Sequence, residues 1–331
     1  MPCLLDFLSF NANIKKMKPR FSLPAGILVW VILVTGCFLF ACDQGDDVKK
    51  VDLSQRKQIQ TPTEFDSLTY ACLPQYSHRV SFARHHHLVQ YLAEKTDLAI
   101  RQVFPDTFEE HMQMVRSGQI DISFSNPLVY TRIADRGQAR AFARIVEKNQ
   151  TPTFRGQIIC RADNKAIETL QDCRGKRWMA VDRSSAAGYL FALDHFLENG
   201  ISKSDFQRIS FAPGPGGKQE TVVQAVYLGQ ADIGSIREGT LELVKDRVDP
   251  SAIRVLDQTR AFPSWVYAAR KDLESEVVDK IKQALLELDP DNADHRTILQ
   301  KAHFEAVIPA QDTDFDAIRR LLEKIGENAY E

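Results

Sequence analysis

The sequence predicts an α/β protein with two similar lobes, each a mostly parallel sheet flanked by helices. First, short apolar runs typical of buried strands alternate with amphipathic stretches typical of helices. Second, this alternation occurs twice, between about 66 and 124 and again between about 157 and 236. Third, the pattern Gly-Gln-x-Asp-Ile occurs at 118–122 and at 229–233, each time after an amphipathic helix and before a strand.

The first lobe is expected to begin at about Asp66 and to follow the order β-α-β-α-β. Its first strand is ended by Pro74, and its second helix is closed by Gly118. Because parallel strands need a crossover connection, usually a helix, this order predicts a parallel sheet. The predicted strands span 67–73, 98–104 and 120–124, and the predicted helices span 82–95 and 107–117.

The second lobe repeats this order and is followed by a longer C-terminal region. Its predicted strands span 157–161, 177–181, 206–211 and 231–236, and its predicted helices span 167–171, 190–197 and 219–228. Further strands are expected at 253–256 and 265–270, and further helices at 277–288 and 314–328. The last helix has apolar residues at helical spacing, which indicates packing against a core and nothing more.

The first 41 residues are predicted to be a lipoprotein signal peptide. Four basic residues, Lys15, Lys16, Lys18 and Arg20, precede the apolar run 25–41, and polar residues follow it. Leu39-Phe40-Ala41-Cys42 resembles a lipobox, in which the cysteine is lipidated, so Cys42 is the expected lipidation site. Met17 is a more typical start for such a signal.

Two alternatives for this segment stay open. Cys37 ends a second sequence of lipobox type, and residues 21–41 approach the ~20 residues that a membrane-spanning helix needs. In each case the folded part lies outside the cytoplasm. Residues 42–65 are polar and charged, which is typical of a flexible tether.

Composition limits the possible functions. The chain has 331 residues, of which 44% are hydrophobic, so about two globular domains are expected. A formal net charge of -2 provides no basic surface for nucleic acid. Among the cysteines of the folded part, Cys160 and Cys173 could pair in an oxidising compartment, or Cys72 and these two are small buried hydrophobes.

A polar turn at 182–189 opens the predicted helix 190–197. Ser184 or Ser185 is a natural N-cap, and the first N–H groups of a helix have no intrahelical partners. Together with the helix dipole, these groups suit an anion. The alternative is a capped helix with no ligand.

Other chemistries find little support. Residues 212–219 approach a P-loop, but they lack its first glycine and its Ser or Thr. His85, His86 and His87 point in directions about 100° apart on a helix, so one metal ion cannot bind all three, even with His78 nearby. No hydrolase or metalloprotease motif occurs. We therefore expect no enzyme activity, no cofactor and no metal site.

Five segments in order resemble the phosphonate- and phosphate-type (PhnD-like) substrate-binding proteins of ABC importers. Residues 121–130 resemble that family's strand followed by a small residue, Pro and Tyr, and residues 170–177 resemble its Asp-Leu-Lys-Gly-Lys turn. Residues 184–189 are similar to its serine-rich loop. Ala225-Val226 with Gly229 and Asp232, and then 270–273, follow in matching order. The similarity spans about 66–288.

The resemblance implies a two-lobed type II periplasmic-binding-protein fold, in which two hinge strands join the lobes. Hinges are expected near 160–163 and 258–262. Lobe I would then comprise 66–161 and 259–331, and lobe II would comprise 162–258. Because ligands of open α/β sheets bind at the carboxyl ends of the strands, the loops at 184–188, 125–130 and 235–238 should converge.

The function that the resemblance implies is that of an extracytoplasmic solute-binding protein. It would be a lipid-anchored monomer that binds a small phosphonate, phosphate, phosphite or similar oxyanion and delivers it to an ABC permease. Three alternatives stay open: presentation of the ligand to a membrane sensor kinase, binding of another small organic ligand, and an enzyme on the same fold.

The resemblance also implies the ligand contacts. The family's serine-rich helix start holds the phosphonate oxygens, which implies donors from Ser184, Ser185, Ala186 and Gly188. The remaining implied contacts are Gln75, Tyr76, Ser125, Asn126, Tyr130, Gln219 and Glu238. Ala187 and Gln219 replace a serine and a histidine of the family pattern, so fewer donors are present and the ligand stays open. Glu238 could pair with an amine of the ligand, or Arg237 with a second anion.

Overall fold

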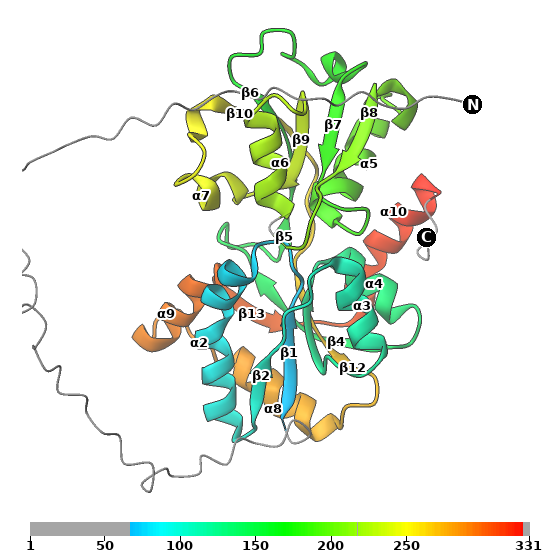
Figure 1. Cartoon of the computed structure of the whole chain (residues 1–331). Coiled ribbons are helices and arrows are strands. Elements are labelled where there is room, and N and C mark those ends of the chain that lie inside the picture. Colours follow the sequence, from blue (N-terminus) through cyan, green and yellow to red (C-terminus); the bar gives the residue numbers. More distant parts are fainter. Residues whose placement is uncertain (1–66, 217, 327–331) are drawn as a thin grey trace, which may run out of the picture. The chain divides into compact units, whose positions relative to one another are not determined.

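The structure, a computed structural model, describes residues 67–216 and 218–326, which form two large sheets with their helices and one two-stranded sheet (Figure 1). The predicted signal peptide, the tether and Cys42 lie outside the described residues. Within the described part, no helix is long and apolar enough to cross a membrane.

Lobe I is built on a six-stranded sheet with the order β13-β4-β12-β3-β1-β2. Strands β1, β2 and β3 are parallel, with Tyr70 of β1 opposite Gln102 and Ile122, whereas β12, β4 and β13 pair antiparallel. The prediction of a parallel sheet therefore holds for the three strands linked by crossover helices. The strands are Leu68–Cys72 (β1), Ile100–Gln102 (β2), Ile122–Ser125 (β3), Ala139–Val146 (β4), Val266–Arg270 (β12) and Ala306–Pro309 (β13).

Helices cover both faces of this sheet (Figure 1). Helix α2 (His78–Thr96) contacts α8 (Ser275–Leu286) and α9 (Ala293–Ala302), while α3 (Phe108–Arg116) contacts α4 (Pro127–Ala134). Apolar side chains from these helices, among them Leu88, Met112 and Ile281, are almost fully buried against the sheet.

Lobe II has a five-stranded sheet with the order β10-β6-β9-β7-β8. Here β7, β8 and β9 are parallel, and β6 and β10 are antiparallel. The strands are Gly156–Arg161 (β6), Arg177–Ala180 (β7), Arg208–Phe211 (β8), Ile233–Arg237 (β9) and Ile253–Gln258 (β10). The helices are Ala186–Leu190 (η3), Phe191–Glu198 (α5), Lys218–Tyr227 (α6) and Thr240–Val244 (α7), with short 3-10 turns at Leu170–Cys173 (η2), Lys203–Asp205 (η4) and Pro250–Ala252 (η5).

Two short strands, Thr153–Phe154 (β5) and Phe262–Pro263 (β11), pair with each other where the chain passes between the lobes. Phe262 stacks on Phe191 with ring centroids 3.8 Å apart, so the crossing is packed against the start of α5. The predicted first hinge at 160–163 and the lobe boundary at 161 are wrong. Strand β6 pairs with β9 and β10 and therefore belongs to lobe II. The second predicted hinge adjoins β11.

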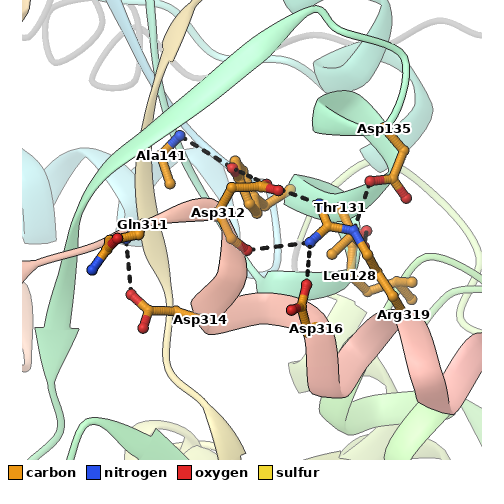
Figure 2. Close-up of polar contacts among 10 residues, drawn as sticks. Leu128, Thr131, Asp135, Ala141, Gln311, Asp312, Asp314, Asp316 and Arg319 are labelled. Atoms are coloured by element: carbon orange, nitrogen blue, oxygen red, sulfur yellow. Dashed lines mark hydrogen bonds and ion pairs between the residues drawn. The ribbon is translucent and has the colours of Figure 1, made fainter.

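The C-terminal elements η6 (Asp312–Phe315) and α10 (Asp316–Ile325) contact both lobes. Arg319 of α10 reaches Asp135, at the end of α4, and Asp312 and Asp316 (Figure 2). Lys324, one turn further on, binds Asp194 of α5 at 2.7 Å.

The repeated Gly-Gln-x-Asp-Ile pattern has the same structural role in both lobes. Asp121 accepts hydrogen bonds from the N–H and hydroxyl of Thr69, at the start of β1, both at 2.9 Å. Asp232 accepts from the N–H of Arg177 at the start of β7, at 2.8 Å, and pairs with its guanidinium. The hydrogen bonds and charge of Arg177 lower the pKa of Asp232. Each aspartate therefore ties the first parallel strand of its sheet, β1 or β7, to the third parallel strand, β3 or β9.

The three cysteines of the folded part are free, so no bridge joins Cys160 and Cys173. Both are buried in the core of lobe II.

We expect Asp232→Asn to lower the free energy of unfolding by about 1–2 kcal/mol at pH 7, because it removes a charged acceptor that is partly screened by solvent. Since the pKa of Asp232 is lower in the folded than in the unfolded state, its contribution is complete above the unfolded pKa of about 3.9 and is lost as pH falls through the folded pKa. Urea unfolding should therefore separate the wild type from Asp232→Asn at pH 7, and the two unfolding curves should approach each other in acid.

Asp163→Asn, which breaks an exposed ion pair with Arg161, is the matched control and should change the unfolding curve little. Equal effects of the two variants would contradict this assignment.

Candidate functional site

The loops that follow β1, β3, β7 and β9 meet between the two lobes and enclose a small cavity. Strand β1 is parallel to β3, and β7 is parallel to β9, so the carboxyl ends of each pair lie at one edge of its sheet. In open α/β sheets this is the edge at which ligands bind. The cavity measures about 10 Å³, roughly the space that one water molecule requires. Its lining residues are Gln75, Phe108, Asn126, Phe154, Ser185, Ala186, Ala187, Gln219, Arg237 and Trp265.

A helix start in lobe II forms one wall of this cavity. Ser185 is its N-cap, and the helix continues from η3 into α5. The turn before it is fixed by Asp182, whose side chain accepts the Ser184 N–H at 2.9 Å and binds Lys218 at 3.1 Å. Backbone N–H groups at a helix start lack intrahelical partners, and Ala186 and Ala187 lie at the cavity wall. The wall thus offers amide donors at the positive end of a helix dipole.

Gly188 lets the helix start pack closely against Val181, because glycine has no side chain. A Cβ atom at this position would lie 2.4 Å from Cγ2 of Val181, so only glycine lets the helix pack on the chain that leaves β7. The Gly188 N–H donates to Oγ of Ser185 at 3.1 Å. This N–H completes the cap and is not directed at the cavity, in contrast to the role that the resemblance implied.

Arg237, at the end of β9, places a buried positive charge at the cavity. Its side chain is 9% exposed and forms an ion pair with Glu147, which follows β4 of lobe I. The guanidinium lies over the rings of Phe154 and Trp265, 5.3 and 5.9 Å from their centroids. Gln219 fixes the backbone, because its side-chain oxygen accepts the Arg237 N–H at 3.0 Å. The charge is therefore held between both lobes and the crossing strands.

Several buried donors around the cavity have no hydrogen-bond partner. These are Nε1 of Trp265, Nε of Arg237 and the hydroxyls of Tyr76 and Ser125. A buried polar group without a partner costs about 1–3 kcal/mol, so such groups are rare in folded proteins. Trp265 and Arg237 line the cavity directly. Their arrangement suits a ligand that accepts several hydrogen bonds.

Asn126 and Ser184 join the lobes instead of both facing the cavity. Asn126 is the N-cap of α4, where its oxygen accepts the Val129 N–H at 2.9 Å, and its amide donates to the carbonyl of Ser184 at 3.2 Å. Arg132 of lobe I donates to the hydroxyl of Ser184. Ser184 is thus an interlobe contact and is absent from the lining of the cavity.

Tyr130 does not reach the cavity, so the expected ligand contact is wrong. It lies on α4, which the sequence analysis missed, with its ring against Phe315, 4.7 Å between centroids. Its hydroxyl donates to Asp312 at 2.7 Å and accepts from the Ala141 N–H. Figure 2 shows Asp312 and Ala141 within this group of contacts beside Arg319.

Glu238 faces a second, larger cavity of about 300 Å³ that shares Arg237 with the first. One oxygen of Glu238 accepts the Arg155 N–H at 3.0 Å. Burial raises the pKa of Glu238. Both lobes line this second cavity, which borders the Glu147–Arg237 pair.

Of the predicted contacts, Gln75, Asn126, Ser185, Ala186 and Gln219 meet at the small cavity, and Tyr76 and Ser125 are buried nearby with unpartnered hydroxyls. Trp265, Phe154, Phe108 and Glu147 were not predicted. Each lies outside the resembling motifs, and no local pattern marks a residue that reaches the cleft from a strand end.

The polar side chains and amides of the site are suited to binding a ligand. Burial raises the pKa of the Cys72 thiol to about 12, which keeps it protonated. The described residues contain no group of His, Cys, Asp or Glu that could hold a metal ion. The donors at the small cavity are amides, an indole and a guanidinium, which together match an oxyanion.

Comparison with known proteins places the chain among transport components. The family model of periplasmic substrate-binding proteins of ABC phosphonate transporters matches residues 70–315. A phosphate-import protein of Mycolicibacterium smegmatis is 23% identical over 294 residues, which cover 82% of this chain and 90% of that protein. A tetrathionate sensor histidine kinase of Salmonella typhimurium is 21% identical over 193 residues, which cover 55% of this chain but only 33% of that protein.

Solved structures show the same fold. The binding-protein component of an ABC phosphonate transporter of Pseudomonas aeruginosa has a TM-score of 0.71 at 18% identity, covering 78% of this chain and 86% of that chain. A protein of Prochlorococcus marinus solved with methylphosphonate also has a TM-score of 0.71, at 16% identity, covering 80% and 99%. The predicted two-lobed type II periplasmic-binding-protein fold is confirmed.

Tyr130→Phe should lower the free energy of unfolding by about 1–3 kcal/mol, because it removes the hydroxyl's hydrogen bonds to Asp312 and to the Ala141 N–H and leaves the ring packing intact. Thermal or urea unfolding measures this change. A tyrosine hydroxyl with no structural role would leave stability unaltered, and that result would contradict the assignment.

Proposed function

Because the chain belongs to the family of periplasmic substrate-binding proteins of ABC phosphonate transporters, we propose that its small interlobe cavity binds the anionic head of a phosphonate, phosphate, phosphite or similar oxyanion. The family accounts for the general role, that of an extracytoplasmic solute-binding protein. The named relatives are a phosphate importer and a protein solved with methylphosphonate, which makes these anions the first ligands to test.

The observation that carries this proposal is the convergence of unpartnered donors from both lobes and the crossing strands. Trp265 provides an indole N–H and Arg237 a guanidinium, and both are buried at the cavity. Opposite them lies the helix start at Ser185, where amide donors and the helix dipole favour negative charge. An oxyanion supplies the acceptors that these donors lack.

Binding in such a cleft requires movement of the lobes. The cavity has room for about one water molecule, and the Asn126–Ser184 and Glu147–Arg237 contacts cross between the lobes. A phosphonate therefore enters when these contacts separate, and it stabilises the closed form because it binds both lobes at once. Differential binding to the closed form is what shifts such an equilibrium.

We also propose that the protein is anchored to the membrane and delivers its ligand to an ABC permease. Cys42 is the proposed lipidation site, which would tether a monomer to the outer face of the membrane beside an ABC permease. We propose no enzymatic turnover, because the site offers hydrogen-bond donors without an activated nucleophile. A role with a sensor kinase has weaker support, since the matching sensor is covered over only a third of its length.

Trp265→Phe is the sharpest test, because it removes the indole N–H and retains an aromatic ring. We expect methylphosphonate to bind about tenfold more weakly, as loss of a hydrogen bond to a charged ligand predicts. The smaller ring should also lower the stability of the ligand-free protein somewhat, because Trp265 is buried against Phe124 and Arg237, so binding is compared at a temperature at which both proteins are folded. Isothermal calorimetry and thermal unfolding report the two quantities.

Tyr130→Phe is the matched control, since it also removes one aromatic donor but lies away from the cavity. It should leave methylphosphonate binding unaltered. If Trp265→Phe binds methylphosphonate as the wild type does, Trp265 does not hold the ligand.

A further inference from the structure

We propose that the second interlobe cavity is a subsite for a second anionic group, centred on Arg84, so that the preferred ligands are phosphonates or phosphate esters with a distal carboxylate. The inference rests on the proposed function of the small cavity, because both cavities must hold one ligand. The two cavities share Arg237 and therefore adjoin, so a ligand held in the first can place a distal group in the second when the lobes close around it.

Arg84 is a buried cation that lacks a carboxylate partner among the residues that the structure describes. It projects from α2, is 7% exposed, and lines the second cavity. Its guanidinium donates to the carbonyl of Ala302 at 2.8 Å and lies over the ring of Tyr76, but Nε has no partner. Within the described residues, no carboxylate lies within ion-pair distance of it. Burying an uncompensated charge is costly, and an anionic ligand group would offset that cost.

The carboxylates of this cavity are already engaged. Glu147 pairs with Arg237, and Glu242 pairs with Lys245 at the surface. Glu238 accepts the N–H of Arg155. The cations are in excess after these pairings, since Lys148 also lines the cavity and no ion pair of it is found in the part of the chain that the structure describes.

The field in this region is positive beyond the cavity itself. Besides burial, the charges of Arg84, Lys148 and Arg237 lower the pKa of His303 to about 4, so this histidine is neutral at pH 7. A neighbouring hollow between α2 and α9 is lined by Arg79, Arg84, Lys301 and His303 and by no acidic residue. A path lined by one sign of charge attracts ligands of the opposite sign.

The opposite assignment would use Glu238 to bind an ammonium group. Glu238 is only partly buried and already accepts a backbone hydrogen bond, whereas Arg84 is buried and has no counter-charge within 67–216 and 218–326. The group that needs a counter-charge is therefore the guanidinium of Arg84, which favours a carboxylate on the ligand. An amine-bearing ligand serves as the competing probe.

Calorimetry with a matched set of phosphonates tests the subsite on the wild-type protein. The set is methylphosphonate, propylphosphonate, 3-phosphonopropionate and 3-aminopropylphosphonate, which differ in the charge at the distal end. We expect 3-phosphonopropionate to bind about tenfold or more tightly than propylphosphonate, as a charge-assisted hydrogen bond to Arg84 predicts. The ammonium compound should bind no better than propylphosphonate.

Arg84→Met should abolish the advantage of the carboxylate while methylphosphonate binds as before, and Arg84→Lys should retain part of it. Arg101→Met, which changes an exposed arginine of β2 outside both cavities, is the control and should alter neither. Because the ligand series alone decides the question in the wild type, a poorly folded variant does not leave it open.

The outcomes separate the two proposals. Binding of methylphosphonate with no gain from the carboxylate, or with a gain from the ammonium group, overturns the anionic subsite and leaves the proposed function standing. Failure of every phosphonate to bind overturns both. A carboxylate gain that survives Arg84→Met contradicts the role of Arg84.

Discussion

The buried ion pair between Glu147 and Arg237 is the contact on which the cleft depends. One partner follows β4 of lobe I and the other ends β9 of lobe II, and both side chains are less than a tenth exposed. Buried ion pairs contribute little net stability, because desolvation offsets much of their attraction. When the lobes separate, both charges regain water. The pair therefore fixes how the lobes meet without locking them together, as a reversible ligand-binding cleft requires.

Around this pair, the fold brings donors to one place from segments far apart in the chain. The helix start at Ser185, the amide of Asn126 and the indole of Trp265 belong to lobe II, lobe I and the returning chain after β11. Each is positioned by local packing: Gly188 against Val181, Asn126 as a helix cap, and Trp265 against Arg237. Preorganised donors of this kind reduce the entropy cost of binding. The same two-sided arrangement couples ligand binding to closure of the lobes.

Local sequence patterns were sufficient for the parts of the fold that strong periodicity marks. The strand, turn and helix at 177–198 were predicted because burial and capping are encoded within a few residues. The repeated segment indicated two similar lobes, but the role of its aspartates emerged only from the structure. Helix α4 was missed because residues 125–130 were predicted to be a loop, although Asn126 and Pro127 are a capped helix start. Strand β4, with mixed burial and arginines at 140 and 144, has little alternation. The hinge strands are two residues long, too short for any pattern.

The site was predictable only where a motif carries it. Ser185 and Asn126 lie in segments that resemble the family, whereas Trp265 reaches the small cavity and Glu147 the second cavity through long-range contacts that no local pattern encodes. For Tyr130 the motif was misleading: the residue was predicted to contact the ligand, but helix α4 directs its side chain toward Phe315.

A crystal structure with methylphosphonate would show directly whether an oxyanion binds at the helix start opposite Trp265. The phosphonate oxygens should lie within hydrogen-bond distance of Nε1 of Trp265 and of the backbone amides of Ala186 and Ala187. A phosphonate bound elsewhere, with the small cavity unaltered, would contradict binding at this helix start.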